Sequence, residues 1–188
     1  MLADPGNRER APEPLRLVQA FVNTLDIENG VEELESPEAL ARVVAEIGAW
    51  AGDGPTLGAA DLEVALATRE ALRRLALANN GVSVASGELE ALDRVAAAAR
   101  LTLCVDGGRL TLVPQAQGLE GALGRILAAA YGGMADGTWR RLKACPREVC
   151  HWVFYDRSRN GSGKWCSMSV CGNRVNTSAY RHRHASTT

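Results

Sequence analysis

The sequence predicts a mainly α-helical protein, in which a multihelical N-terminal domain with one β-hairpin precedes a small cysteine-rich C-terminal module. Three observations predict this fold class. Apolar residues recur at helical spacing over most of the first 135 residues. The period changes once to strict alternation, over residues 101–113. Four of the five cysteines lie between residues 145 and 171.

Four helices are expected before the alternating segment. Residues 15–25 (LRLVQAFVNTL) have one apolar face. A second helix begins at Ser36-Pro37, an N-cap followed by proline at the first helical position, and ends before the GDGP stretch at 52–55. A third helix spans 61–78 and ends at an Asn-Asn-Gly sequence, and a fourth spans about 87–100.

The alternating segment predicts a β-hairpin. Residues 101–105 (LTLCV) and 110–113 (LTLV) are its strands, and the DGGR sequence between them suits a tight turn. A helix at 119–131 and a short helix over TWRRLKA (138–144) are expected to follow. We therefore divide the chain into a disordered leader (1–14), a helix-rich N-terminal domain (15–135) and the cysteine-rich module (136–188).

Composition and charge limit the class of protein. The chain has no run of eighteen apolar residues and no apolar N-terminal signal, so we expect a cytoplasmic protein with reduced thiols. The net charge of −1 hides a division, because residues 1–138 carry −9 (11 Lys/Arg, 20 Asp/Glu) and residues 139–188 carry +8 (10 against 2). This division suggests a basic module for a polyanion. Mutual neutralisation of the two parts across an interface is the alternative.

The four clustered cysteines have the spacing of a metal site. Cys145-x4-Cys150 and Cys166-x4-Cys171 are equal pairs separated by fifteen residues. Each pair can form a knuckle whose thiolates converge on a tetrahedral zinc ion. HWVFYD (151–156) and KWCS (164–167) are typical of strands, and a hairpin of the two would bring the pairs together. One zinc ion with four sulfur ligands would be structural, since no position stays open for water.

Disulfides, an iron–sulfur cluster and four unrelated buried thiols are the alternatives. A reducing compartment disfavours disulfides, and the two-plus-two spacing favours zinc over an iron–sulfur cluster. Unrelated thiols would not usually pair symmetrically. Residues 139–188 also hold few aliphatic side chains, so zinc would supply much of the folding free energy of this module.

The residues around the cysteines predict a basic surface. GNRVNTSAYRHRH (172–184) can continue as a C-terminal helix that places two arginines seven residues apart on one face. Arginine suits phosphates and guanine, and asparagine suits adenine. A solvated helix is the alternative. The candidate nucleic-acid contacts are Arg157, Arg159, Lys164, Asn173, Arg174, Arg181 and Arg183.

The N-terminal domain has no evident catalytic set, and we expect no enzyme. It contains no histidine, and its one cysteine, Cys104, lies within an apolar strand. Asn23, Thr24 and Asp26, at the end of the first helix, are candidates for a ligand pocket. Helix-end capping explains the same three residues.

The C-terminal motifs resemble the CGNR zinc-finger family. The resemblance rests on CPREVCHWVFYDRSRN (145–160), WCSMSVCGNR (165–174) and the YR pair at 180–181. Upstream, FVNTLD (21–26) and WRRLKAC (139–145) are similar to the N-terminal domain that accompanies this finger. The resemblance implies bacterial stress-related transcriptional regulators whose finger binds DNA. It also implies that Cys145, Cys150, Cys166 and Cys171 are the zinc ligands.

The sequence thus predicts a DNA-binding transcriptional regulator with one structural zinc ion, whose N-terminal domain senses a small-molecule effector or forms a homodimer. The rival interpretations are a zinc-stabilised protein- or RNA-interaction module and a thiol-based redox sensor. Trp152, Phe154 and Trp165 discriminate between DNA and the interaction module. If these side chains are buried in the core, the finger can bind only through contacts with the DNA backbone. If they are exposed, they favour stacking on bases or a groove that binds protein.

Overall fold

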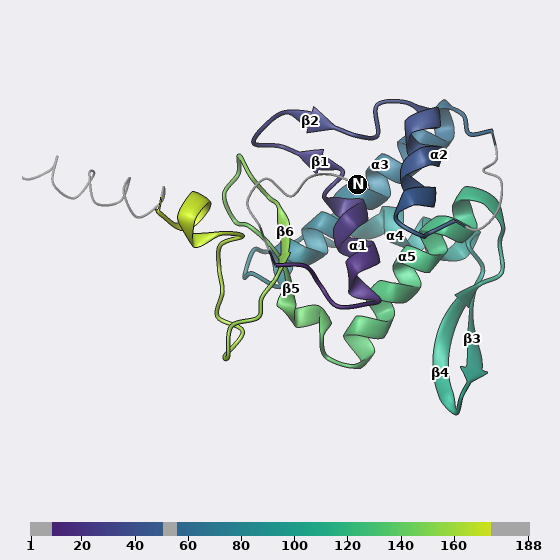
Figure 1. Cartoon of the computed structure of the whole chain (residues 1–188). Coiled ribbons are helices and arrows are strands. Elements are labelled where there is room, and N and C mark those ends of the chain that lie inside the picture. Colours follow the sequence, from purple (N-terminus) through teal and green to yellow (C-terminus); the bar gives the residue numbers. More distant parts are fainter. Residues whose placement is uncertain (1–8, 51–55, 174–188) are drawn as a thin grey trace, which may run out of the picture.

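The computed structural model describes residues 9–50 and 56–173 and confirms the predicted fold class (Figure 1). The helices are α1 (Leu15–Val22), α2 (Pro37–Glu46), α3 (Ala59–Ala78), α4 (Glu90–Ala98) and α5 (Gly118–Ala135). The antiparallel strand pairs are β1 (Leu25–Asp26) with β2 (Val31–Glu32), β3 (Leu101–Asp106) with β4 (Arg109–Pro114), and β5 (Leu142–Ala144) with β6 (Val153–Tyr155). Single helical turns are η1 (Ser86–Leu89), η2 (Trp139–Arg141) and η3 (Met168–Gly172).

Helices α1, α3 and α5 form the centre of the helical body. Helix α1 packs on both α3 and α5, and α4 lies against the same two helices. Phe21, Leu72 and Ile126 are fully buried between them. A Cβ atom at Gly133 of α5 would lie 2.6 Å from Leu15 Cδ2. Glycine at this position therefore permits the close approach of α1 and α5.

The five helices predicted before residue 136 and the predicted hairpin are all present, with ends that differ by a few residues from the prediction. Helix α2 begins at Pro37, and the Ser36 hydroxyl accepts the Ala39 amide hydrogen (3.2 Å) as an N-cap. Helix α3 begins two residues before the predicted start, because the Asp61 carboxylate accepts the Gly58 amide hydrogen (2.8 Å) and caps the helix there. The β3–β4 hairpin extends each predicted strand, with Leu101 opposite Pro114 and Asp106 opposite Arg109.

The short helix predicted over TWRRLKA (138–144) is wrong. Residues 139–141 form the single turn η2, and residues 142–144 form strand β5. All three β5 residues are buried and pair with β6. A strand forms here in place of a helix because Asn79, directly after α3, bonds to the carbonyl groups of this segment. The Asn79 amide donates to the carbonyls of Trp139 and Leu142 (2.8 Å each).

The hairpin predicted between HWVFYD and KWCS is also wrong in its second strand. Strand β6 lies within HWVFYD as expected, but its partner is β5. Residues 164–167 form no strand. The Lys164 carbonyl accepts the Asn80 side-chain amide (2.8 Å) instead of pairing with β6.

Residues 9–14, which the sequence assigned to the leader, lie against the helical body. Ala11 is buried, and its amide donates to the Gln19 side-chain oxygen (2.7 Å). The Glu9 carbonyl accepts the Tyr155 amide hydrogen (3.1 Å). The remainder of the predicted leader, residues 1–8, lies outside the described part of the chain.

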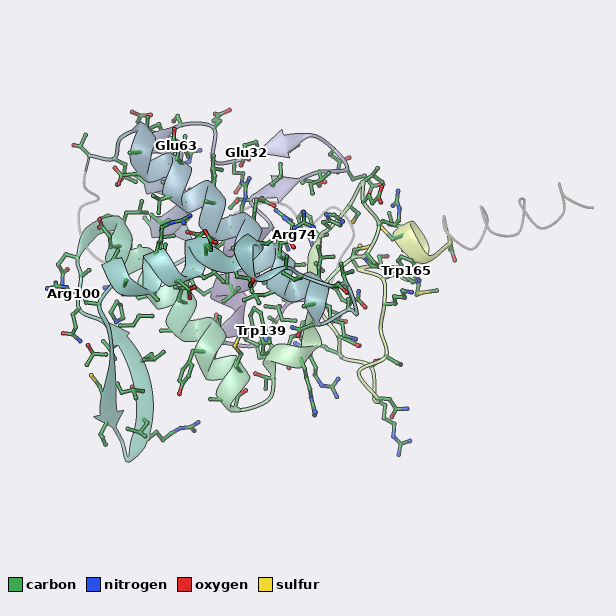
Figure 2. All side chains as sticks on the ribbon, turned by 180° about the vertical axis from the view of Figure 1, so that it is seen from behind. Glu32, Glu63, Arg74, Arg100, Trp139 and Trp165 are labelled. Atoms are coloured by element: carbon green, nitrogen blue, oxygen red, sulfur yellow. The ribbon has the colours of Figure 1, made fainter. Side chains whose placement is uncertain are left out.

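The β3–β4 hairpin and the cysteine-rich region lie at opposite ends of the molecule. Figure 1 shows the hairpin projecting from the helical body on the side away from η3. Figure 2 shows the same separation from behind, with Arg100 at the base of the hairpin and Trp165 beside η3. None of the helices in residues 9–50 and 56–173 is long and apolar enough to cross a membrane.

Candidate metal centre

The structure brings the four predicted cysteines together. Cys145 directly follows β5, Cys150 precedes β6 by two residues, and Cys171 lies in η3. All four side chains are buried, and their Sγ atoms lie within 4.8 Å of one another. The Sγ atom of Cys166 lies 3.7 Å from that of Cys150 and 3.5 Å from that of Cys171. The Sγ atoms of Cys171 and Cys150 are 3.7 Å apart.

These sulfur separations fit a tetrahedral zinc ion. Zinc–sulfur bonds of about 2.3 Å give a tetrahedron with edges of roughly 3.7–3.8 Å. A disulfide would require a sulfur separation of about 2.05 Å, and the cysteines are free thiols. The site therefore has the donor set and the size of a closed, structural zinc site, as the spacing predicted.

Hydrogen bonds among three of the cysteines shift their pKa values in opposite directions. Hydrogen bonds from the Cys150 and Cys166 thiols lower the pKa of Cys145 to about 2. The bond to Cys145 raises the pKa of Cys150 to about 12 and raises the pKa of Cys166 as well. Of these three cysteines, Cys145 is therefore the one whose thiolate is favoured. Four thiolates require a compensating positive charge, which Zn²⁺ supplies when bound.

Backbone and side-chain groups around the sulfurs hold the two knuckles in place. The Cys145 amide donates to the Trp152 carbonyl (2.9 Å), and the Cys150 amide donates to the Arg147 carbonyl (2.9 Å). The Arg147 guanidinium donates to Cys171 Sγ (3.1 Å), which raises the pKa of Arg147 and links the first knuckle to the second. Outer contacts of this kind orient metal ligands.

The residue after Cys150 adopts a left-handed backbone conformation. His151 has φ +47°, which turns the chain from the knuckle into β6. Histidine tolerates this region better than most residues with a side chain. The His151 carbonyl accepts a hydrogen bond from Arg73 of α3 (3.2 Å), so the turn is fixed from outside the knuckle.

Strand β6 and its preceding residue belong to two hydrophobic clusters. Val153 and Tyr155 pack into the core of the helical body. Trp152 and Phe154 pack on the other side against the four cysteines. Because side chains alternate along a strand, one short segment is shared between the helical core and the metal centre. The metal centre is therefore joined to the helical body by packing as well as by sequence.

Asn23 of the predicted ligand pocket makes the main polar contact between α1 and β6. The Asn23 side chain accepts the Val153 amide hydrogen and donates to the Val153 carbonyl, both at 2.8 Å. Gln19, one turn earlier, donates to the same carbonyl (3.1 Å). Strand β6 pairs with β5 on one edge, and the two bonds from Asn23 satisfy the Val153 backbone groups on the other edge.

The other two predicted pocket residues also stabilise local structure. The Thr24 hydroxyl donates to the Phe21 carbonyl (2.8 Å), and the Asp26 carboxylate accepts two hydrogen bonds from Asn29 (3.1 and 2.8 Å). The cavity that Asn23 lines is about 80 Å³, well below the roughly 300–1,000 Å³ of small-molecule sites. These contacts agree with the capping alternative.

Sequence reasoning missed three polar residues, one in α3 and two directly after it, that hold the cysteine-rich region. Arg73 is 2% exposed and donates to the carbonyls of Val22 (2.8 Å) and His151. Asn79 and Asn80 extend from the end of α3 to the β5 carbonyls. A signal for Arg73 was present in the sequence, because it lies four residues after Arg69 on the buried face of α3. Asn79 and Asn80 were interpreted only as helix-ending residues.

Asp156 organises the loop that carries the candidate nucleic-acid contacts. Its buried carboxylate accepts hydrogen bonds from Lys143 (2.8 Å) and from the amides of Ser158 (3.0 Å) and Gly163 (2.8 Å). Burial opposes ionisation, but the bonds from Lys143 and Ser158 hold the pKa of Asp156 at about 2. Gly163 is needed at its position, because a Cβ atom there would lie 2.7 Å from Asp156 Oδ1.

The basic residues of this region divide into buried and exposed groups. Arg141 and Lys143 donate to carbonyl groups of the 156–163 loop and serve the fold. Arg157 is exposed but pairs with Glu9 (2.9 Å). Arg159, Lys164 and Asn173 are exposed. The other predicted contacts, Arg174, Arg181 and Arg183, lie outside the described residues.

Comparisons with known families agree with this architecture. A family model described as "CGNR zinc finger" matches residues 141–184. A second model, ABATE, described as "Putative stress-induced transcription regulator", matches residues 15–137, which are 123 of the 188 residues. A search of curated proteins gave no match. Four converging cysteines within a zinc-finger match assign a structural zinc ion to this centre.

Proposed function

The chain belongs to the ABATE family, described as "Putative stress-induced transcription regulator", and from this premise we propose that it is a cytoplasmic regulator that binds DNA through its zinc finger. Zinc would hold the two knuckles together. The exposed cations of the finger would pair with DNA phosphates. In this proposal the protein acts by binding and catalyses no reaction.

The position of the exposed cations carries the proposal. Arg159 and Lys164 lie on the loop that Asp156 fixes, and Asn173 ends the described part of the chain beside the second knuckle. Residues 174–184 add three arginines and two histidines directly after it. A rigid loop next to a basic segment is suited to a phosphate backbone, because the cations lose little freedom on binding.

The burial of the aromatic residues favours DNA over a base-stacking or protein-binding surface. Trp152 and Phe154 are each 4% exposed and belong to the packing around the cysteines. Trp165 is half-buried, with the Lys164 ammonium 5.6 Å from its ring centroid. Proteins that read single strands place aromatic faces in solvent, which Trp152 and Phe154 do not.

Duplex DNA binding measured against salt concentration tests the proposal. The zinc-loaded wild type should bind at low salt, with a steep fall in affinity as salt rises. Replacing Arg159 and Lys164 with alanine should reduce the salt slope by about one unit for each lost phosphate contact. Arg42→Ala, an exposed arginine of α2, is the matched control and should leave the slope unchanged. No binding by the zinc-loaded wild type at low salt would refute the proposal.

We also propose a site for a small-molecule effector other than the one suggested by the sequence. A groove of about 390 Å³ lies between α3, α4 and α5, and its lining includes Val64, Val95 and Leu119. This volume is in the range of small-molecule sites, whereas the cavity beside Asn23 is not. Asp61, Glu63 and Glu120 also line the groove, together with one cation, Arg94, which lies 3.7 Å from Glu90. Because acidic residues outnumber it, an apolar molecule with a positive charge would fit the groove.

A further inference from the structure

We propose that the β3–β4 hairpin and the neighbouring surface of α5 form a homodimer interface, in which the hairpin of each copy covers the apolar groove of the other. The proposal rests on the exposed apolar residues of this region and does not depend on DNA binding.

The strand register places a continuous apolar surface on one face of the hairpin. Leu101 pairs with Pro114, Leu103 with Leu112, and Val105 with Leu110. Because side chains alternate, these six residues share one face. Leu103 is 55% exposed, Val105 75% and Leu110 67%. An exposed apolar hairpin whose only charged strand residues are Asp106 and Arg109, beside the turn, is an association surface unless something covers it.

The apolar surface continues from the hairpin onto α5. A groove of about 470 Å³ lies between them, lined by Leu17, Leu112 and Tyr131 among others. Tyr131 and Met134 of α5 are both more than a third exposed. Within residues 9–50 and 56–173, ten large apolar side chains are exposed, and six of them belong to the hairpin or to α5. This concentration distinguishes the region from the rest of the described surface.

A second copy of the chain is the partner that fits this surface. The strand residues 101–105 and 110–113 carry no acidic or basic side chain, so they offer nothing to a nucleic acid or a charged peptide. Two identical apolar surfaces are complementary to each other, and the charged residues of the groove are of both signs (Arg109, Arg125 and Asp136), so a two-fold axis can pair them. The β3–β4 sheet has two strands, so each strand also has an edge outside the sheet that can meet its equivalent in the other copy.

The size of the surface is close to that of a small dimer interface. Six hairpin residues form the apolar face, and eleven further residues line the groove. The total of 17 is slightly below the roughly 20–30 residues per partner of a standard interface, which agrees with a dimer that forms at micromolar concentrations. The hairpin lies at the end of the molecule away from the zinc finger (Figures 1 and 2). A dimer formed through it leaves both fingers uncovered.

Sedimentation equilibrium of the full-length, zinc-loaded chain tests the proposal. The wild type should be dimeric at micromolar concentrations. Val105→Glu with Leu110→Glu should raise the dimer Kd by about 100-fold or more, since two apolar side chains per copy would be replaced by charges. Val31→Glu, at a side chain of β2 that is 44% exposed, is the matched control and should leave the Kd unchanged. A monomeric wild type at high micromolar concentration, or a double variant that dimerises as tightly as the wild type, would overturn the proposal.

Hydrogen exchange of the wild type at two protein concentrations gives a readout that needs no substitution. Amides of residues 101–114 should exchange more slowly at the concentration where the dimer forms, while amides of α2 should be unaffected. Equal exchange of the hairpin amides at both concentrations would also overturn the proposal.

Discussion

Replacing Asn23 with alanine should uncouple the metal centre from the helical body. The Asn23 side chain makes two buried hydrogen bonds to Val153, both at 2.8 Å. In Asn23→Ala the Val153 carbonyl keeps its bond from Gln19, but the Val153 amide loses the Asn23 oxygen that accepts its hydrogen, and this buried donor is left unsatisfied. An unsatisfied buried donor costs about 1–3 kcal/mol, and a lost net hydrogen bond costs about 0.5–1.5 kcal/mol. The free energy of unfolding should therefore fall by about 2–4 kcal/mol.

Urea denaturation of the zinc-loaded full-length protein measures this loss. Asn160→Ala is the matched control, because Asn160 is an exposed asparagine of the 156–163 loop and its replacement should change stability by less than about 0.5 kcal/mol. The Asn23 variant should also lose zinc to a chelator faster, since Trp152 and Phe154 pack on the cysteines from the same segment. An Asn23→Ala protein as stable as the control would refute the coupling between α1 and β6.

Three further substitutions test the contacts around the metal centre. Gly163→Ala should lower the melting temperature, at a cost of about 1–3 kcal/mol, because its Cβ would meet Asp156; Gly132→Ala, with nothing within 4 Å, should be neutral or slightly stabilising. Arg73→Met should destabilise the protein by at least about 2 kcal/mol in denaturant titrations, whereas Arg74→Met, a 46% exposed neighbour, should have little effect. Although burial opposes ionisation, hydrogen bonds lower the pKa of Asp156 from 3.8 to about 2, so its contribution is complete above about pH 4 and is lost as the pH falls towards 2. The stability difference between wild type and Asp156→Asn should accordingly stay constant from about pH 5 to 8, and a difference that grows with pH over this range would contradict the assignment.

The helical body could be predicted because its signals are local. The apolar face of α1, the Ser36-Pro37 start of α2 and the alternation of β3 and β4 each lie within one short segment. The zinc centre was also predictable, since two equally spaced pairs of cysteines are typical of a site in which four thiolates bind one zinc ion. The exposure of the hairpin face was not, because strand alternation shows which residues share a face but not what covers that face.

The contacts that join the finger to the body could not be predicted, because they connect residues far apart in sequence. Asn23 and Val153 are 130 residues apart, and Arg73 and His151 are 78 apart. Leu142 and Ala144 appeared helical from their local sequence, but burial against α3 and pairing with β6 make them a strand. Arg141 and Lys143 contribute to the positive charge of residues 139–188, but in the structure they donate to carbonyl groups of the 156–163 loop. Tertiary hydrogen bonds outweighed local preference at each of these positions.

Hydrogen exchange of the full-length protein before and after zinc chelation is the most direct test of the central claim, that zinc holds a finger which shares β6 with the helical body. We predict one zinc ion per chain before chelation. After chelation, protection should be lost over residues 145–152 and 164–173, where all four cysteines lie, and reduced in β6, while α3 and α5 keep theirs. Unchanged protection of residues 145–173 after complete zinc removal would contradict the account.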